Sequence, residues 1–237
     1  EQGVAESGRQ RGVPTRVRGE RLEFFSSLNK KPKIATITRG LKQQGGRDII
    51  LVRSNEKLEQ GDIGMWPFPP LRVKGDWLEG RAFDDTLQVG VLTYILEKAC
   101  KERWSKAFSV LFTRAEEVGY VGAWEIFQGK RPTLPQTIIT LEVPRAGGDV
   151  VSGEGVVLRV GDSNISFDQE LILHLGQTAS LLKKKLPWFT YQRRLAFFGG
   201  TETTVFYAQG YKAGGLSIAA QHGHNINRTK NGRPAPE

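Results

Sequence analysis

Residues 155–184 read GVVLRVGDSNISFDQELILHLGQTASLLKK, and this stretch decides the class of fold. Its first six residues are a short apolar run rich in valine, which is typical of a buried strand. A polar turn follows. From Phe167 to about Lys184 apolar residues recur at helical spacing, and the lysines at the end suit the negative pole of a helix dipole. The stretch therefore predicts a strand followed by an amphipathic helix.

The alternation of strands and helices continues on both sides of this stretch. Residues 85–103 are predicted to be helical, because Leu87, Val91 and Ile95 recur four residues apart. A short helix is expected after Gly119 and another after Thr201. Further strands are predicted at residues 108–113 (FSVLFT), 137–143 (TIITLEV), 190–198 and 216–219. This order predicts an α/β fold, with a mostly parallel sheet that carries helices on both faces.

The first quarter of the chain is β-rich. Residues 34–38 (IATIT) and 48–52 (DIILV) are short β-branched segments separated by glycines. Residues 61–70 (GDIGMWPFPP) contain too much glycine and proline for a helix. We therefore expect two domains, residues 1–77 and residues 78–237.

Composition predicts a soluble protein of a reducing compartment, with a cytoplasmic location. Of 237 residues, 38% are hydrophobic and 25% are charged, and Cys100 is the only cysteine, which excludes an intrachain disulfide. No apolar run approaches the roughly 18–20 residues that span a bilayer. The N-terminal residues contain no apolar signal-peptide core.

The net charge of +9 comes from 34 Lys and Arg against 25 Asp and Glu. Basic residues gather in the first 35 residues, at residues 183–185 and at Arg193 with Arg194. Aromatic residues do not alternate with them as they do on many nucleic-acid-binding surfaces. We interpret these clusters as solvated faces, so nucleic acid is not an expected partner. A basic nucleic-acid-associated protein is the alternative.

Four polar clusters lie at or near the ends of predicted strands: Asp84 with Asp85, Glu116 with Glu117, Glu142, and His222 with His224. In open α/β sheets, ligands bind outside the carboxyl ends of the strands. Adjacent glutamates repel each other unless a cation or a proton compensates their charge. Carboxylates with an imidazole and no cysteine suit zinc, manganese or cobalt. The clusters therefore predict a metal site.

Four phrases carry a family resemblance, in this order: GRAFDDTLQVGV (residues 80–91), FTRAEEVGYVGAWE (112–125), GGTETTVF (199–206) and LSIAAQHGHN (216–225). Together they resemble the co-catalytic zinc aminopeptidases, in particular the deblocking or glutamyl aminopeptidases that form tetrahedral assemblies. Residues 48–64 (DIILVRSNEKLEQGDIG) resemble the end of the small β-barrel that this family inserts into its catalytic domain. Residues 1–77 would then be part of a lid or oligomerisation barrel, and residues 78–237 the metallopeptidase-like catalytic domain.

The resemblance implies a role for each cluster. Asp84 would bridge two metal ions, and Glu117 and His224 would bind one of them. Glu142 falls where the family has a ligand for the other ion, usually aspartate. Glu116 would be the general base that takes a proton from the attacking water.

Asp85 would support the geometry of the site, and the resemblance also implies a cis peptide bond between Asp84 and Asp85. The implied function is a metal-dependent aminopeptidase that hydrolyses N-terminal residues from peptides. Its cofactor would be two zinc ions, with cobalt or manganese as substitutes. The implied assembly is a homo-oligomer.

The chain departs from the family pattern in three respects. The family has another histidine ligand in a His-x-Asp phrase ahead of the barrel, but the histidines here are His174, His222 and His224. Glutamate replaces aspartate at Glu142 and Glu202, and the chain ends soon after His224. We therefore expect at most one tightly bound metal ion, and we interpret the chain as a fragment of a longer protein. A diverged, inactive relative is the alternative.

Overall fold

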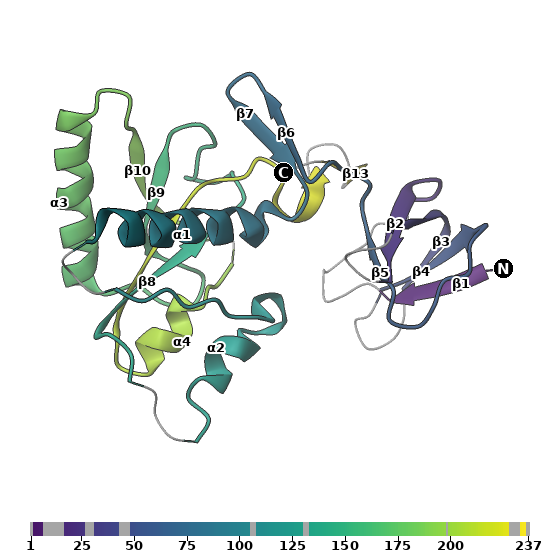
Figure 1. Cartoon of the computed structure of the whole chain (residues 1–237), viewed down its shortest axis with the longest axis horizontal. Coiled ribbons are helices and arrows are strands. Elements are labelled where there is room, and N and C mark those ends of the chain that lie inside the picture. The colour runs from purple at the N-terminus through teal and green to yellow at the C-terminus, as the bar shows by residue number, and fades with distance from the viewer. Residues whose placement is uncertain are drawn as a thin grey trace. The chain divides into compact units, whose positions relative to one another are not determined.

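The computed structural model describes residues 2–6, 17–26, 31–42, 48–104, 108–129, 133–197, 199–227 and 233–235 (Figure 1). The chain forms two compact units. The first contains residues 1–81 and 224–237, and the second contains residues 82–223. The second unit is therefore one continuous stretch inserted between two parts of the first.

An antiparallel sheet of five strands forms the first unit. In spatial order these are β1 (Gln2–Glu6), β4 (Asp48–Ser54), β3 (Lys33–Lys42), β2 (Arg21–Phe25) and β5 (Ile63–Met65). β3 and β4 contain the two strands that the sequence predicted, and the stretch rich in glycine and proline forms no helix. β1 and β5 lie at opposite edges of the sheet, so the described strands form an open sheet, consistent with part of a barrel.

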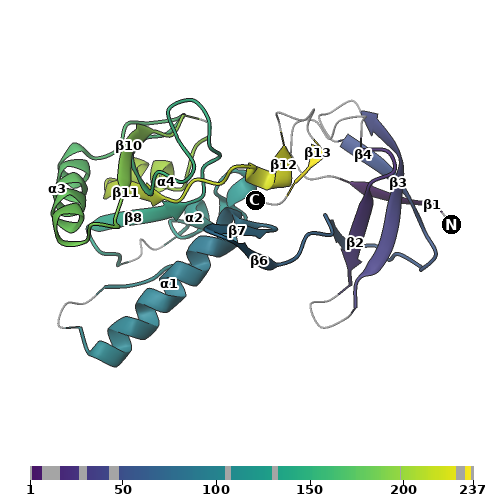
Figure 2. The ribbon, with the colours of Figure 1, turned by 90° about the horizontal axis from the view of Figure 1, so that it is seen from above.

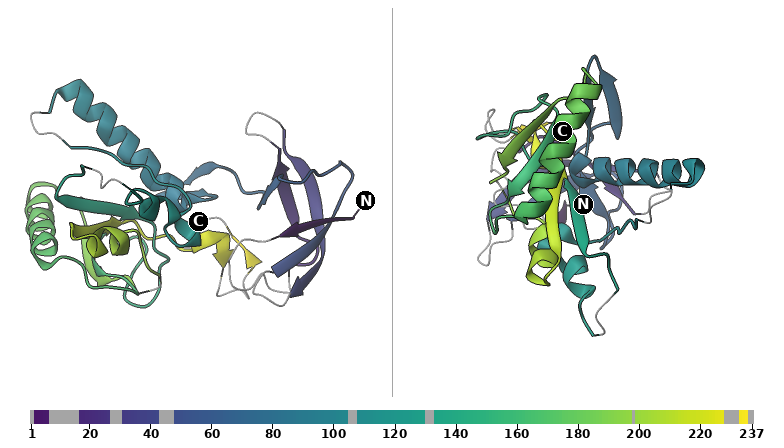
Figure 3. Two further views of the ribbon diagram at one scale, coloured as in Figure 1. Left: turned by 90° about the horizontal axis from the view of Figure 1, so that it is seen from below. Right: turned by 90° about the vertical axis from the view of Figure 1, so that its left-hand side faces the viewer.

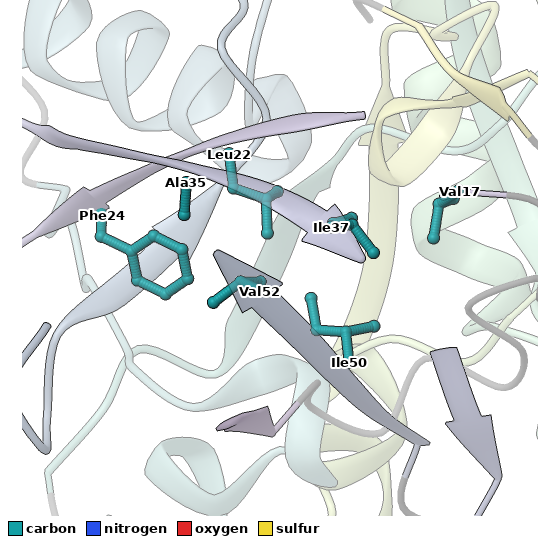
Figure 4. Packing of buried hydrophobic residues seen from close by; sticks show 7 residues of the cluster. All are labelled: Val17, Leu22, Phe24, Ala35, Ile37, Ile50 and Val52. Carbon is teal, nitrogen blue, oxygen red and sulfur yellow. The ribbon is translucent and has the colours of Figure 1, made fainter. Parts of the chain in front are cut away.

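The core of the first unit lies on one face of this sheet (Figure 4). Along β2, Leu22 and Phe24 are buried and their neighbours are less so, which is the alternation expected when one face is covered. The buried cluster consists of Val17, Leu22, Phe24, Ala35, Ile37, Ile50 and Val52. Leu58 and Trp66 pack against it.

The end of the chain is fastened to the same unit. β6 (Leu71–Lys74) pairs with β7 (Trp77–Gly80), and β12 (Ile226–Asn227) pairs with β13 (Arg233–Pro234). The buried side-chain amide of Asn225 donates to the carbonyl oxygens of Gly80 (3.1 Å) and Ala235 (3.2 Å). One side chain therefore joins the end of β7 to the C-terminal residues.

A mixed sheet of four strands forms the centre of the second unit. Its order is β10 (Tyr191–Leu195), β9 (Val156–Gly161), β11 (Lys212–Ser217) and β8 (Thr137–Glu142). β10 runs parallel to β9 and β8 runs parallel to β11, but β11 and β9 are antiparallel. The prediction of a mostly parallel sheet is thus confirmed in part: the two outer pairings are parallel and the central one is antiparallel.

Helices cover both faces of this sheet, as predicted. They are α1 (Phe83–Glu102), α3 (Gln169–Lys185) and α4 (Thr203–Ala208). The unit also contains α2 (Val121–Glu125) and the 3-10 turn η1 (Glu116–Val118), and the 3-10 turn η2 (Gly223–Asn225) spans the boundary between the two units. Leu171 of α3 comes within 3.0 Å of the position that a Cβ would occupy at Gly214 of β11. Ala213, whose side chain points to the opposite face, clusters with Val205 and Phe206 of α4. The C-terminal half of α1 runs away from the sheet (Figures 2 and 3).

Residues 108–113 do not form the buried strand that their sequence predicts. They pair with no strand in the described part of the chain, and Phe108, Leu111 and Phe112 are exposed. A strand forms only where a neighbouring edge supplies backbone hydrogen bonds. Here residues 109–113 and β8 line one cavity instead of pairing with each other.

The position of β11 also differs from the prediction. The strand begins at Lys212 rather than near Leu216, because it includes Gly214 and Gly215, whose low strand propensity hides it in the sequence. These glycines are required by close packing, since a Cβ at Gly215 would lie 3.1 Å from the ring of Phe167.

Ile37→Ala should destabilise the first unit by about 2–5 kcal/mol, because Ile37 is only 1% exposed and truncation leaves a cavity in its core. Hydrogen exchange of β2, β3 and β4 in urea would measure the loss. Ile63→Ala is the matched control, since Ile63 is 64% exposed, and we expect an effect within about 0.5 kcal/mol. Equal losses in the two variants would contradict the assignment of this core.

Candidate metal centre

Two aspartates stand where α1 begins. The peptide bond between Asp84 and Asp85 is cis, which confirms the expectation from the resemblance. Ala82, just before them, has a φ of 55°, in the left-handed region that non-glycine residues rarely adopt. Asp84 and Asp85 also depart from helical dihedral angles. Residues 82–85 therefore do not form a regular first turn of α1, and this irregular backbone sets the positions of the two carboxylates.

Glu142 ends β8, and α1 is fixed beside it. The buried Gln88 of α1 donates from Nε2 to the carbonyl oxygen of Glu142 (2.9 Å). This bond holds the start of the helix against the carboxyl end of the strand. As a result, Asp84, Asp85 and Glu142 each offer a carboxylate oxygen, and these oxygens lie within 4.8 Å of one another.

Glu116 and Glu117 form the start of η1. Ala115, directly before them, has a φ of 59°, so this turn also departs from ordinary backbone geometry. The turn packs tightly, because a Cβ at Gly122 would collide with the backbone of Arg114. Only a residue without a side chain fits there, which accounts for the glycine.

A second group of ligand atoms combines Glu117 with Asp84 and His224. One ligand atom from each lies within 4.8 Å of the others. His224 is joined directly to Gly223, the last residue of the second unit, and has a φ of 58°. Non-glycine residues with positive φ often mark functional sites, where the surrounding structure enforces them.

The structure therefore brings together five of the six residues to which the resemblance gives a role, in two groups that share Asp84. Asp85, expected only to support the site, is itself within ligand range. Glu116 belongs to neither group, but its charge raises the pKa of Asp85 and of Glu142, so it lies near both.

Burial and mutual repulsion dominate the electrostatics of this cluster. Although Asp85 as a whole is solvent-exposed, desolvation of its carboxyl group, followed by the charges of Asp84, Glu116 and Glu202, raises its pKa to about 8. Burial raises the pKa of Glu142 well above its usual range, and the charge of Asp84 adds to this effect. Both shifts have causes that a bound cation would oppose.

A cavity of about 380 Å³ opens beside the carboxylates. Glu202 lines it, and its Oε1 accepts a hydrogen bond from the hydroxyl of Thr113 (2.6 Å). Burial raises the pKa of Glu202, and the bond from Thr113 opposes part of that shift. The sequence had marked Glu202 only as a departure from the family pattern.

Asp162 organises the loop that leads to Glu202, and sequence reasoning missed it. This buried carboxylate accepts from the backbone N–H groups of Asn164 (2.8 Å) and Ile165 (3.0 Å). Its other oxygen accepts from the N–H and the hydroxyl of Thr201, both at 2.9 Å.

Gly200 lies so close to Asn164 and Tyr120 that a Cβ there would collide with both. The glycine pair of the GGTETTVF phrase was the available signal.

Arg159 is a second polar residue that the sequence did not single out. It is 3% exposed, and its Nη2 donates to the carbonyl oxygen of Ala196 (3.2 Å). Its side chain lies across Gly215, where a Cβ would sit 3.4 Å from its Cδ. Burial lowers the pKa of Arg159, and the charge of Glu142 opposes this shift. Arg159 is thus a fixed positive charge near the acidic cluster.

The remaining candidates lie elsewhere. His174 is exposed on α3 and His222 is partly buried, and neither joins a metal-sized group among the described residues. Lys183, Lys184 and Lys185 are exposed in the last turn of α3, as predicted for a solvated face. None of them lines the cavity at the carboxylates.

Solved structures with the same fold include several archaeal peptidases. The Pyrococcus horikoshii TET1 peptidase, described as assembling into a tetrahedron or a large octahedral shell, is 17% identical with a TM-score of 0.69 over 88% of this chain and 66% of its own. An aminopeptidase from Desulfurococcus kamchatkensis is 20% identical with a TM-score of 0.67, covering 90% of this chain and 64% of its own. The TET aminopeptidase of a marine sediment thaumarchaeon is 20% identical with a TM-score of 0.62, covering 88% and 64%. The fold is therefore that of the TET aminopeptidases.

The sequence identifies the family. The family model of the M42 glutamyl aminopeptidases matches residues 51–232, so the chain belongs to the M42 family. No curated protein sequence matches the chain. The chain spans slightly less than two thirds of the length of the solved structures, between 64% and 66% for these three. Within the described residues, no helix is long and apolar enough to cross a membrane.

The metal-free chain should become less stable as the pH rises between about pH 5 and pH 8. Asp85, Glu142 and Glu202 have raised pKa values in the folded state. In that window the folded state binds more protons than the unfolded state, so deprotonation favours unfolding. Urea denaturation at a series of pH values measures the trend.

Asp85→Asn should flatten this pH dependence, and Asp76→Asn, in the exposed turn between β6 and β7, should leave it unchanged. A free energy of unfolding that stays constant across the window in the unsubstituted chain would contradict the electrostatic account of the cluster.

Proposed function

We propose that the protein is a metal-dependent aminopeptidase that removes N-terminal residues from peptides. One observation carries the proposal: in a chain of the M42 family, two groups of potential ligands share the single carboxylate of Asp84. Paired-metal hydrolysis needs two ions held roughly 3.5–4 Å apart, and a shared carboxylate is one way to hold them.

The donor chemistry of both groups suits divalent metals. Asp84, Glu117 and His224 offer two carboxylates and one imidazole, a ligand set typical of catalytic zinc sites with an open position. Asp84, Asp85 and Glu142 offer carboxylates alone, so we expect this second group to hold zinc more weakly. The raised pKa values of Asp85 and Glu142 support a cation site. Zinc is the proposed cofactor, and manganese or cobalt would suit the same donors.

The proposed mechanism assigns different tasks to two neighbouring glutamates. A divalent metal ion held by Asp84, Glu117 and His224 would supply Lewis acidity at the scissile carbonyl and at the attacking water. Glu116 accepts a proton from the attacking water as the C–O bond forms, and it then donates this proton to the nitrogen of the leaving amine as the C–N bond breaks. Glu117 stays in the ligand group. The negative charge of the cluster also attracts the α-ammonium group of the substrate.

Peptide substrate, homo-oligomeric assembly and cytoplasmic location remain parts of the proposal. Assembly is supported by the related TET1 peptidase, which forms closed shells. It is also supported by the β6–β7 hairpin of the first unit, where Leu71, Val73 and Trp77 are exposed. Apolar side chains gathered on one hairpin favour an interface with another copy of the chain.

Titration of the purified chain with Zn²⁺ in a calorimeter should show one tightly bound ion, because only the first group contains an imidazole. Glu117→Gln and His224→Ala should each weaken this binding by more than about 100-fold, since even the loss of residues that only orient ligands costs 10–100-fold. His174→Ala is the matched histidine control and should not change the affinity, since His174 is exposed on α3.

Two tight equivalents of zinc would contradict our interpretation of the second group, and so would normal binding by His224→Ala. In either case His222→Ala would show whether His222 acts as a substitute ligand.

The zinc-loaded chain should hydrolyse aminoacyl substrates at or near the background rate, because the second group lacks an imidazole. Glu116→Gln should remove any turnover that remains and leave zinc affinity unchanged, since loss of a general base costs about 10²–10⁴-fold in rate. Normal rates in the unsubstituted chain would contradict our interpretation of the second ligand group, and turnover that survives Glu116→Gln would show that the proposed role of Glu116 is wrong.

A further inference from the structure

A second cavity, of about 480 Å³, lies on the five-stranded sheet of the first unit. Its lining comes from β2, β3, β4 and the residues directly after β4, and includes Arg21, Thr36 and Arg53. The neighbours Leu22 and Val52 belong to the buried core of this sheet (Figure 4). Successive side chains of a strand point to opposite faces, so the cavity lies on the face that is turned away from the core.

Three side chains of the lining form a row across the sheet. Arg21 of β2 is paired with Thr36 of β3, and Thr36 is paired with Arg53 of β4. Neighbouring strands are about 4.8 Å apart, so the backbones of the two arginines are about 10 Å apart with the threonine between them. Two long guanidinium side chains and one hydroxyl therefore share one part of the cavity.

The donors of this row are not used within the described part of the chain. There, the side chains of Arg21 and Arg53 have no ion-pair or hydrogen-bond partner, and neither does the hydroxyl of Thr36. The nearby Lys33 of β3, in contrast, forms an ion pair with Asp62 (2.9 Å). The row thus offers two positive charges and a hydroxyl to a ligand that supplies acceptors.

Three other polar side chains of the lining are engaged with the backbone. Thr38 and Ser54 donate to the carbonyl oxygens of Leu51 (3.0 Å) and Ile34 (2.7 Å). The carboxylate of Glu56 accepts a long hydrogen bond from the N–H of Ile34 (3.4 Å). Two guanidinium charges against one carboxylate leave the lining with a net positive charge, which favours an anion.

We propose that this cavity binds a phosphate group, which Arg21 and Arg53 hold from two sides and Thr36 contacts between them. A phosphate dianion presents three strong acceptor oxygens, enough for two guanidinium groups and a hydroxyl. The planar guanidinium donates two parallel hydrogen bonds to such oxygens. A carboxylate has one charge and two oxygens, which a single arginine already satisfies, so the second arginine favours phosphate. The ligand is inorganic phosphate or a small phosphate monoester.

Titration of the zinc-free chain with inorganic phosphate, followed in two-dimensional amide NMR spectra, tests this site. At about pH 8 phosphate is mostly dianionic, and the amides of Arg21, Thr36 and Arg53 should shift together and saturate at one ion per chain. Phenyl phosphate should cause the same shifts if the site accepts monoesters, and inorganic phosphate alone would restrict the site to the free ion. Acetate and dimethyl phosphate carry one charge each and should bind about tenfold more weakly or less.

Four variants and one control make the result specific. Arg21→Gln and Arg53→Gln should each weaken phosphate binding by about tenfold, and Thr36→Val should weaken it by about threefold. Glu56→Gln removes a nearby negative charge and should tighten binding by about two- to fivefold. Arg193→Gln removes the same charge from an exposed position on β10 and should leave the affinity unchanged. All five side chains are exposed, so the spectra of the ligand-free variants should show an intact fold.

Three outcomes would overturn the proposal. Without a saturating shift for either phosphate probe there is no site, and equal affinity for acetate would assign the cavity to carboxylates. Equal weakening by Arg193→Gln and Arg21→Gln would show attraction by the overall positive charge instead of a built site. The titration contains no zinc, so failure of the proposed metal centre would leave its result unchanged, and the two failures are distinguishable.

Discussion

Repulsion among carboxylates at the end of β8 and the start of α1 is the constraint on which the rest of the second unit depends. Asp84, Asp85 and Glu142 lie within ligand distance of one another, and burial makes their charges harder to sustain. A chain left to its local preferences would separate them. They stay together because the bond from Gln88 fixes the helix to the strand and because Ala82, just before the two aspartates, adopts a left-handed conformation. The surrounding fold therefore holds the carboxylates together although their mutual repulsion and their burial are unfavourable.

Elements with a strong local period were predictable from the sequence. β8, β9 and α3 were predicted because their apolar residues repeat at strand or helix spacing. In the structure, neighbouring strands and helices cover the apolar faces that this spacing creates. β11 was placed too late because Gly214 and Gly215 serve packing and carry no strand signal. The failure at residues 108–113 has a different origin, since strand propensity is realised only when a partner edge is present. The antiparallel pairing of β9 with β11 is a property of topology, which local periodicity does not encode.

The residues of the candidate site also fall into those that the sequence pointed to and those that it did not. Asp84, Glu117 and His224 lie in phrases that resemble a known family, and Glu142 lies near the end of a predicted strand, so the resemblance and strand-end reasoning together singled them out. Asp162 and Arg159 were missed because a single buried polar residue has no sequence pattern of its own. Its role depends on the residues that it contacts in the folded chain. Asp162 acts on Glu202 through Thr201, and Arg159 needs the space that Gly215 leaves. Only the three-dimensional structure shows such dependencies.

The order in which the ribosome makes this chain bears on how its two units form. The second unit is one uninterrupted stretch, whereas the first needs residues from both ends of the chain. During synthesis, therefore, every residue of the second unit emerges before Asn225 and Ala235 become available to join Gly80. Domains generally fold as units during synthesis, so residues 224–237 close a unit whose other described residues are made before the second unit. Until then Gly80 lacks its hydrogen bond from Asn225, so a second unit that has already been made stays attached to a first unit that is not yet closed.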